Sequence, residues 1–101
     1  MSETKKERYR RIRGAILKLL AYQHPGPLDI KEIHFLLDDM RYTITQEELQ
    51  SHLCYLSEGK LLIVEKRMAG GICIEMVRIT RDGLNVLDGF GAGDVGVDVR
   101  F

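Results

Sequence analysis

The side chains that could perform metal or acid–base chemistry are few and scattered. The three histidines and two cysteines are residue types that bind zinc, but none of their spacings matches a metal site: His24, His34, His52, Cys54 and Cys73. Asp38 and Asp39 are adjacent, and neighbours on a helix point about 100° apart, so their carboxyls are not expected to share a proton. We therefore expect no metal site and no cofactor.

Motifs of enzymes are also absent from the sequence. It holds no G-x-S-x-G, no G-x-x-x-x-G-K-[ST] and no H-E-x-x-H. The glycines at 89, 91 and 93 follow no predicted strand, so they do not indicate a dinucleotide site. The chain is not expected to be an enzyme.

Basic side chains are the remaining candidates for chemistry, and they are unevenly distributed. Residues 1–13 carry six Lys or Arg and two acids, a net charge of +4, so the rest of this neutral chain carries −4. Such a segment on a mildly acidic body can bind phosphate or another anionic surface. The alternative is a solvated leader that only keeps a helix soluble.

Length and composition set the frame for these side chains. A chain of 101 residues, 45% apolar and 30% charged, suits one globular domain with its own core. No apolar run is long enough to span a membrane, and the N-terminus lacks the apolar region of a signal peptide. We therefore expect a cytoplasmic protein with reduced cysteines.

Three helical patterns occupy the first sixty residues. Apolar residues of segment 4–22 repeat at helical spacing from Ile12 to Leu20, and Pro25 ends that helix. Leu28 is expected to add a short strand to a later hairpin, and Asp29 to cap a helix over 30–40. Thr45 and Glu48 form a capping box for a third helix that ends near Gly59.

Two strand patterns and a last helix follow. Segments 61–68 and 72–79 are rich in Ile, Val and Leu, and Ala69-Gly70-Gly71 supplies the tight connection. Thr80 is expected to cap a helix over 81–88. The remaining residues, 89–101, form a tail that is interpreted as mobile, or as ordered only by a partner.

This order of elements predicts a winged helix-turn-helix. The fold class is mainly helical α+β, with three helices, a β-hairpin wing and a short C-terminal helix. Residues 1–13 are expected to form a basic N-terminal arm and the start of helix 1, residues 14–88 the winged-helix domain, and residues 89–101 a glycine-rich tail.

Binding of double-stranded DNA is the first functional hypothesis for this fold. The third helix would enter the major groove, with base or phosphate contacts from Gln46, Gln50, Ser51 and Tyr55. The arm and the wing would bind phosphate through Arg8, Arg10, Arg11, Arg13, Lys66 and Arg67. Against this hypothesis, the third helix carries acid, including Glu47, and no Lys or Arg lies between Arg41 and Lys60.

The second hypothesis is a dimeric adaptor that binds a protein through the acidic face of the third helix. Leu17 lies off the apolar stripe of the first helix, and Ile72, Ile74 and Met76 add apolar surface to the hairpin. These side chains could form the seam of a homodimer or, alternatively, a thicker monomer core. The partner would be another protein of the same complex.

Three segments resemble the small winged-helix proteins of Mu-like phages and prophages. They are 53–65 (L-x-x-L-x-E-G-K-L-L-x-V-E), 79–86 (I-T-x-x-G-L-x-V) and the ending from Gly89 to Val97. The first is also similar to ArsR-like regulators. The resemblance implies a phage-encoded protein from the late region near the DNA-packaging genes, with no established biochemical activity. Under the first hypothesis, DNA binding would serve a transcription-regulatory or packaging-related role.

Overall fold

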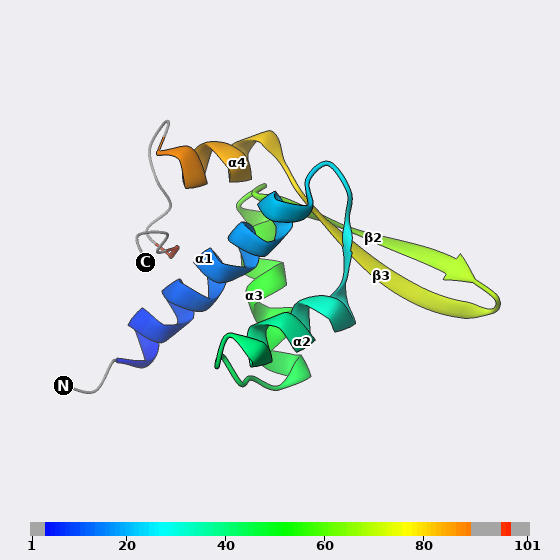
Figure 1. Cartoon of the computed structure of the whole chain (residues 1–101), viewed down its shortest axis with the longest axis horizontal. Coiled ribbons are helices and arrows are strands. Elements are labelled where there is room, and N and C mark those ends of the chain that lie inside the picture. The colour runs from blue at the N-terminus through cyan, green and yellow to red at the C-terminus, as the bar shows by residue number, and fades with distance from the viewer. Residues whose placement is uncertain (1–3, 90–95, 98–101) are drawn as a thin grey trace.

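A computed structural model describes residues 4–89 and 96–97 of the chain. Its elements, in chain order, are α1 (Lys5–Gln23), β1 (Leu28–Asp29), α2 (Ile30–Asp39), α3 (Gln46–Glu58), β2 (Leu62–Ala69), β3 (Ile72–Ile79) and α4 (Arg81–Asp88). The helices gather around α1, and the β2–β3 hairpin projects away from them as a wing (Figure 1). The fold is a winged helix-turn-helix, as the sequence predicted.

Three of the four helices begin at the caps that the sequence predicted. The Asp29 carboxylate accepts from the Lys31 N–H at 2.9 Å, and the Thr80 hydroxyl accepts from the Gly83 N–H at 3.1 Å. Thr45 and Glu48 form the complete capping box, with both hydrogen bonds at 3.1 Å. These bonds satisfy N–H groups that have no partner inside the helix.

The wing is closed by a two-residue turn. Gly70 and Gly71 have φ angles of 58° and 80°, the left-handed conformation that this mirror-image turn requires and that glycine adopts without strain. Ala69 pairs with Ile72, and the register continues to Leu62 opposite Ile79. The sheet order is β1-β3-β2, with Leu28 of β1 opposite Val77, so the short first strand joins the hairpin as predicted.

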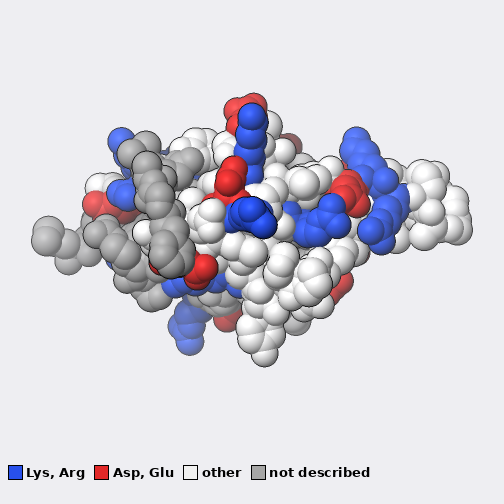
Figure 2. Space-filling view, turned by 90° about the horizontal axis from the view of Figure 1, so that it is seen from above, with Lys and Arg blue, Asp and Glu red and all other residues white. Residues whose placement is uncertain are grey.

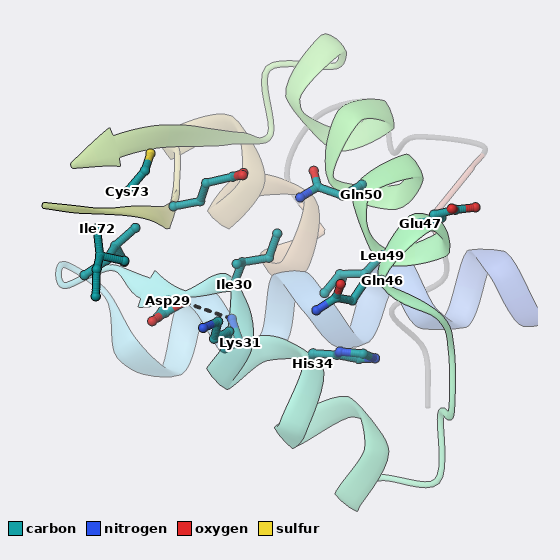
Figure 3. Close-up of a pocket in the computed structure, with 12 residues that line it drawn as sticks. Asp29, Ile30, Lys31, His34, Gln46, Glu47, Leu49, Gln50, Ile72 and Cys73 are labelled. Atoms are coloured by element: carbon teal, nitrogen blue, oxygen red, sulfur yellow. Dashed lines mark hydrogen bonds between the residues drawn. The ribbon is translucent and has the colours of Figure 1, made fainter. Parts of the chain in front are cut away.

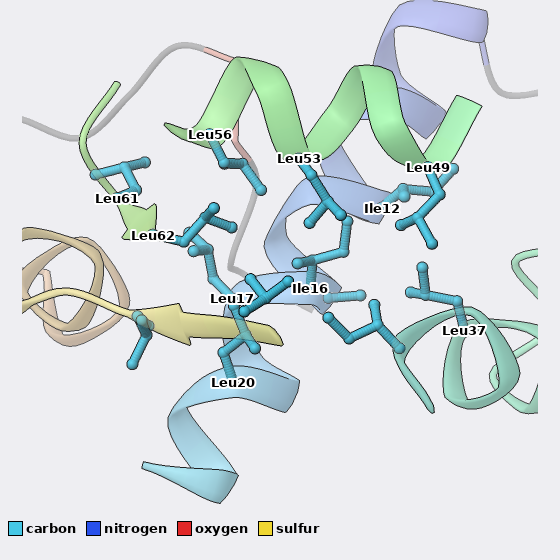
Figure 4. Packing of buried hydrophobic residues seen from close by; sticks show 14 of the residues in the cluster. Ile12, Ile16, Leu17, Leu20, Leu37, Leu49, Leu53, Leu56, Leu61 and Leu62 are labelled. Atoms are coloured by element: carbon cyan, nitrogen blue, oxygen red, sulfur yellow. The ribbon is translucent and has the colours of Figure 1, made fainter. Parts of the chain in front are cut away.

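One apolar cluster holds the helices to the base of the sheet. Buried leucines of α2, α3 and β2 surround α1 (Figure 4). Leu17 is fully buried in this cluster, because α4 and β3 pack on α1 in addition to α2 and α3. Of the two alternatives left open for Leu17, the dimer seam is therefore wrong and the thicker core is correct for this residue. Within the described ranges, no helix combines the length and apolar character needed to cross a bilayer.

At Gly83, α4 packs directly against the residue that precedes β2 and against the end of β3. A Cβ at this position would overlap the Leu61 carbonyl oxygen and lie 2.7 Å from Ile79 Cγ1. Helix propensity alone would make Gly83→Ala stabilising by about 1 kcal/mol. We expect the contact to dominate, so that the variant loses about 1–3 kcal/mol of unfolding free energy in urea denaturation. A gain in stability would contradict this packing of α4.

Candidate nucleic-acid interface

The outward face of α3 is polar and carries no positive charge. Gln46, Gln50 and Ser51, the side chains predicted to meet bases, are all exposed. Glu47 and Glu58 are exposed on the same helix, whose buried side is formed by the predicted leucines together with His52. The helix therefore offers amide and hydroxyl groups to a ligand, beside carboxylates that repel phosphate.

The two acids at the start of α3 have different roles. Glu48 is half-buried and accepts a hydrogen bond from the Thr45 N–H, which lowers the pKa of its carboxyl. It is thus a structural residue of the helix cap. Glu47 is exposed and has no such role, so it can be changed without removing the cap.

The wing carries the predicted cations behind an apolar tip. Figure 2 shows Lys and Arg side chains on the hairpin and none at its end. Met68 and Ile72 flank the tip and are 72% and 65% exposed. Lys66 lies opposite Glu75 and Arg67 opposite Ile74, so the two cations point to opposite faces of the hairpin.

Arg67 belongs to a small ionic network on its face of the wing. Glu65 accepts from Arg78 at 2.7 Å and lies 3.7 Å from Arg67. The three side chains are 37–58% exposed, so these pairs contribute little to stability. Arg67 therefore stays accessible to an anion.

The basic segment at the N-terminus is helical from Lys5 and is not an extended arm. Thr4 caps α1, and its hydroxyl accepts from the Glu7 N–H at 3.1 Å. Arg8 donates to the Thr43 carbonyl at 3.4 Å and lies 5.8 Å from the Tyr42 ring centroid. These contacts hold Arg8 against the turn between α2 and α3, next to the start of α3.

Two of the other predicted arm residues, Arg10 and Arg13, are less accessible than the sequence suggested. Arg10 is half-buried, and its Nε is enclosed without a hydrogen-bond partner among the described residues. Arg11 is exposed. Arg13 turns inward, where its Nε donates to His52 Nδ1 at 3.1 Å and its Nη1 donates to the Gly96 carbonyl at 3.3 Å.

Arg13 and Tyr55 form a cluster that holds part of the tail. The Arg13 guanidinium lies 3.8 Å from the Tyr55 ring centroid, a cation–π distance. A Cβ at Gly96 would overlap the Tyr55 hydroxyl, so only glycine fits there. The side chains of Arg13 and Tyr55 thus make their contacts within the chain, away from the outward face of α3. The sequence did not predict this cluster.

Order at Gly96 and Val97 corrects the interpretation of the tail as mobile. Val97 is 6% exposed and joins the apolar core, and Gly96 is buried beside Tyr55. Contacts within the chain therefore hold these two residues against the core. The rest of the predicted tail, residues 90–95 and 98–101, lies outside the described residues.

His52 is held neutral inside the cluster. Burial and the positive charge of Arg13 lower its pKa from 6.5 to about 4, although Glu48 acts in the opposite direction. Its Nδ1 accepts from Arg13, so the proton of the neutral ring is on Nε2. Tyr9 packs edge-to-face on the ring, with centroids 5.1 Å apart.

A groove of about 600 Å³ separates α3 from the wing. Its lining residues come from the end of β1 and from α2, α3 and β3: Asp29, Ile30, Lys31, His34, Gln46, Glu47, Leu49, Gln50, Ile72, Cys73, Ile74 and Glu75. Gln46 and Gln50 extend from α3 toward the hairpin, and Ile30 lies between the two walls (Figure 3). The groove therefore combines an apolar floor with polar and charged side chains on each of its walls.

The cysteines and histidines do not assemble into a metal site. Among the described residues, no three His, Cys, Asp or Glu side chains are grouped so that they could hold an ion. Cys54 and Cys73 are both exposed free thiols. Cys54 lies 3.5 Å from Glu58 Oε1, and this hydrogen bond raises the pKa of the thiol.

Two solved structures share this architecture. A PadR-like transcription factor from Bacteroides fragilis superposes with a TM-score of 0.66 at 23% identity, covering 77% of this chain and 74% of that one. A PadR family transcriptional regulator from Eggerthella lenta DSM 2243 gives 0.62 at 25% identity, covering 77% and 70%. No family model and no curated protein matches the chain. The likeness is to PadR-like regulators and lends no support to a Mu-like or ArsR-like assignment.

His52 makes the stability of the protein depend on pH. Below pH 6.5 the unfolded state protonates His52, whereas the native state keeps it neutral down to about pH 4. The free energy of unfolding should thus fall between pH 6.5 and pH 4, by roughly 3 kcal/mol in full. Urea denaturation at pH 7, 6 and 5 measures the part of this loss that falls above pH 5, about 2 kcal/mol.

Two variants separate His52 from other titrating groups. His52→Gln should flatten the decline of unfolding free energy over this range, and a matched change at the exposed His24, His24→Gln, should leave it intact. An equal pH dependence in all three proteins would refute the role of His52.

Proposed function

We propose that this chain is a winged-helix regulator of transcription that binds double-stranded DNA. The observation that carries the proposal is the combination of an outward α3 bearing Gln46, Gln50 and Ser51 with a cationic wing beside it. The similar structures are described as a transcription factor and a transcriptional regulator, which supports the same role.

The proposed contacts divide into base readers and phosphate binders. Glutamine can form a bidentate pair of hydrogen bonds with the adenine edge in the major groove, which suits Gln46 and Gln50. The hydroxyl of Ser51 can donate to or accept from a base edge. Lys66 and Arg67 of the wing would bind phosphate. Arg8 of α1, which lies against the turn before α3, would do the same. Arg10 and Arg11 are proposed as secondary contacts. Arg13 and Tyr55 are not among the proposed contacts, because they bind each other and Arg13 binds the Gly96 carbonyl.

Electrostatics set the strength of the proposed complex. The chain has no net charge, and α3 adds no cation, so a few flanking side chains must supply all of the phosphate attraction. Binding should be modest, and most of its salt dependence should come from the wing and from the start of α1.

Replacing both wing cations tests the phosphate contacts. Lys66→Ala/Arg67→Ala should weaken binding to all duplex sequences alike and lower the slope of log affinity against log salt by about 2. Fluorescence anisotropy on a random-sequence duplex across a salt series measures both effects. Arg81→Ala, which removes an exposed cation at the start of α4, is the matched control. An unchanged slope in the double variant would remove the wing from the interface.

Glu47 tests whether α3 faces the duplex. Glu47→Gln removes a carboxylate and keeps the shape and the cap, so DNA affinity should rise about threefold to tenfold at low salt. A double change that included Glu48 would also break the capping box and confuse the result. Weaker or equal binding of Glu47→Gln would mean that α3 does not approach phosphate.

The finer parts of the sequence hypothesis remain proposals. Phage or prophage origin and a packaging role rest on the resemblance of sequence segments alone. Homodimer formation is proposed through the apolar residues that the wing exposes, of which Met68 and Ile72 at its tip are the most accessible. The dimeric adaptor that binds a phage or host protein is the second candidate function, and the groove between α3 and the wing is the observation that favours it.

A further inference from the structure

One edge of the wing is unpaired beside the groove. β1 covers β3 only at Met76 and Val77, so the stretch from Ile72 to Glu75 has no strand on that side among the described residues. An unpaired edge presents N–H and C=O groups that can pair with another extended chain. The same four residues line the groove that faces α2 and α3.

The direction of the free backbone groups follows from the register. In a two-residue hairpin the residues that flank the turn, Ala69 and Ile72, are hydrogen-bonded to each other. Hydrogen-bonded and non-bonded pairs then alternate along an antiparallel ladder. Cys73 and Glu75 therefore direct their N–H and C=O groups away from β2, toward the groove.

The groove differs from the other open edge of the sheet, which belongs to β2. The β3 edge faces Ile30 and Leu49, which offer an apolar floor to side chains of an added strand. None of the residues that line this groove comes from β2. An added strand at the β3 edge would therefore bury side chains against this apolar floor.

Charge favours a basic occupant. Asp29, Glu47 and Glu75 line the groove or its rim, and Lys31 is the basic side chain among the lining residues. The net charge of the lining is therefore negative, which opposes an acidic segment and attracts Lys or Arg.

We infer that the β3 edge from Ile72 to Glu75 and the adjoining groove bind an extended, basic segment of a partner protein by strand addition. The segment continues the line of β1, antiparallel to β3, with apolar side chains on Ile30 and Leu49. Four residues at about 3.4 Å each span the free edge. Main-chain hydrogen bonds to Cys73 and Glu75 supply affinity, and the acidic lining selects for basic residues. This inference does not rest on DNA binding.

A pair of proline variants of the full chain provides the test. Proline removes one N–H, and on an edge strand it is tolerated where that N–H points outward. Cys73→Pro removes an N–H that faces the groove. Met68→Pro removes the equivalent outward N–H of β2, because Met68 lies directly opposite Cys73 in the hairpin.

The probe is a labelled, end-capped eight-residue peptide of alternating valine and lysine, titrated by fluorescence anisotropy. Cys73→Pro should weaken its binding at least about tenfold, and Met68→Pro should change it less than about twofold. The valine–glutamate counterpart should bind more weakly than the lysine peptide. Glu75→Gln should reduce that preference.

A measurement on the unmodified protein guards against misfolded variants. Backbone amide exchange should slow at Cys73 and Glu75 when the lysine peptide is present, and stay unchanged at Lys66 and Met68. Absence of peptide binding, equal loss in both proline variants, or protection on β2 would each overturn the inference. A dimer of this chain that Cys73→Pro dissociates, without peptide binding, would assign the edge to a second copy and overturn it as well.

Discussion

Burial of α1 on several sides is the constraint on which the rest of the molecule depends. Ile12, Ile16, Leu17 and Leu20 are fully buried, and α2, α3, α4 and β3 all pack on this one helix. Each such side chain contributes about 1.5–3 kcal/mol by leaving water. Because α3 and the base of the wing are both fixed to α1, the outward face of α3 and the hairpin keep a defined relation to each other.

The packing of α1 also determines which of its own basic side chains face solvent. A helix turns by about 100° per residue, so a run of cations cannot all face solvent when one side packs on α3. Arg8 reaches the turn before α3, and Arg13, five residues later, points to His52 and Gly96. The guanidinium that could have bound phosphate instead organises a partly buried polar cluster with a neutral histidine and an aromatic ring.

Local signals predicted most of the fold, and contacts between distant segments account for what was missed. The caps at Thr45 and Thr80 and the Gly70-Gly71 turn depend on neighbours within a few residues, so the sequence displays them directly. The contact of Arg13 with Gly96 joins positions 83 residues apart, and no periodicity reports it. Leu17 was misjudged because a helical stripe assumes one buried side. The groove was missed for a similar reason, since three elements build it.

The two proposed ligands would use one surface. Gln46 and Gln50 line the groove and are also the side chains proposed to read bases. A strand seated on β3 would fill the space between α3 and the wing, which a duplex must approach to touch both. The basic side chains of the bound segment would face the acidic lining of the groove. They could contact DNA phosphates only if they turned away from that lining. Steric overlap therefore outweighs any electrostatic bridging, and binding of the segment and of DNA should be mutually exclusive, as expected for a regulator whose partner releases it from DNA.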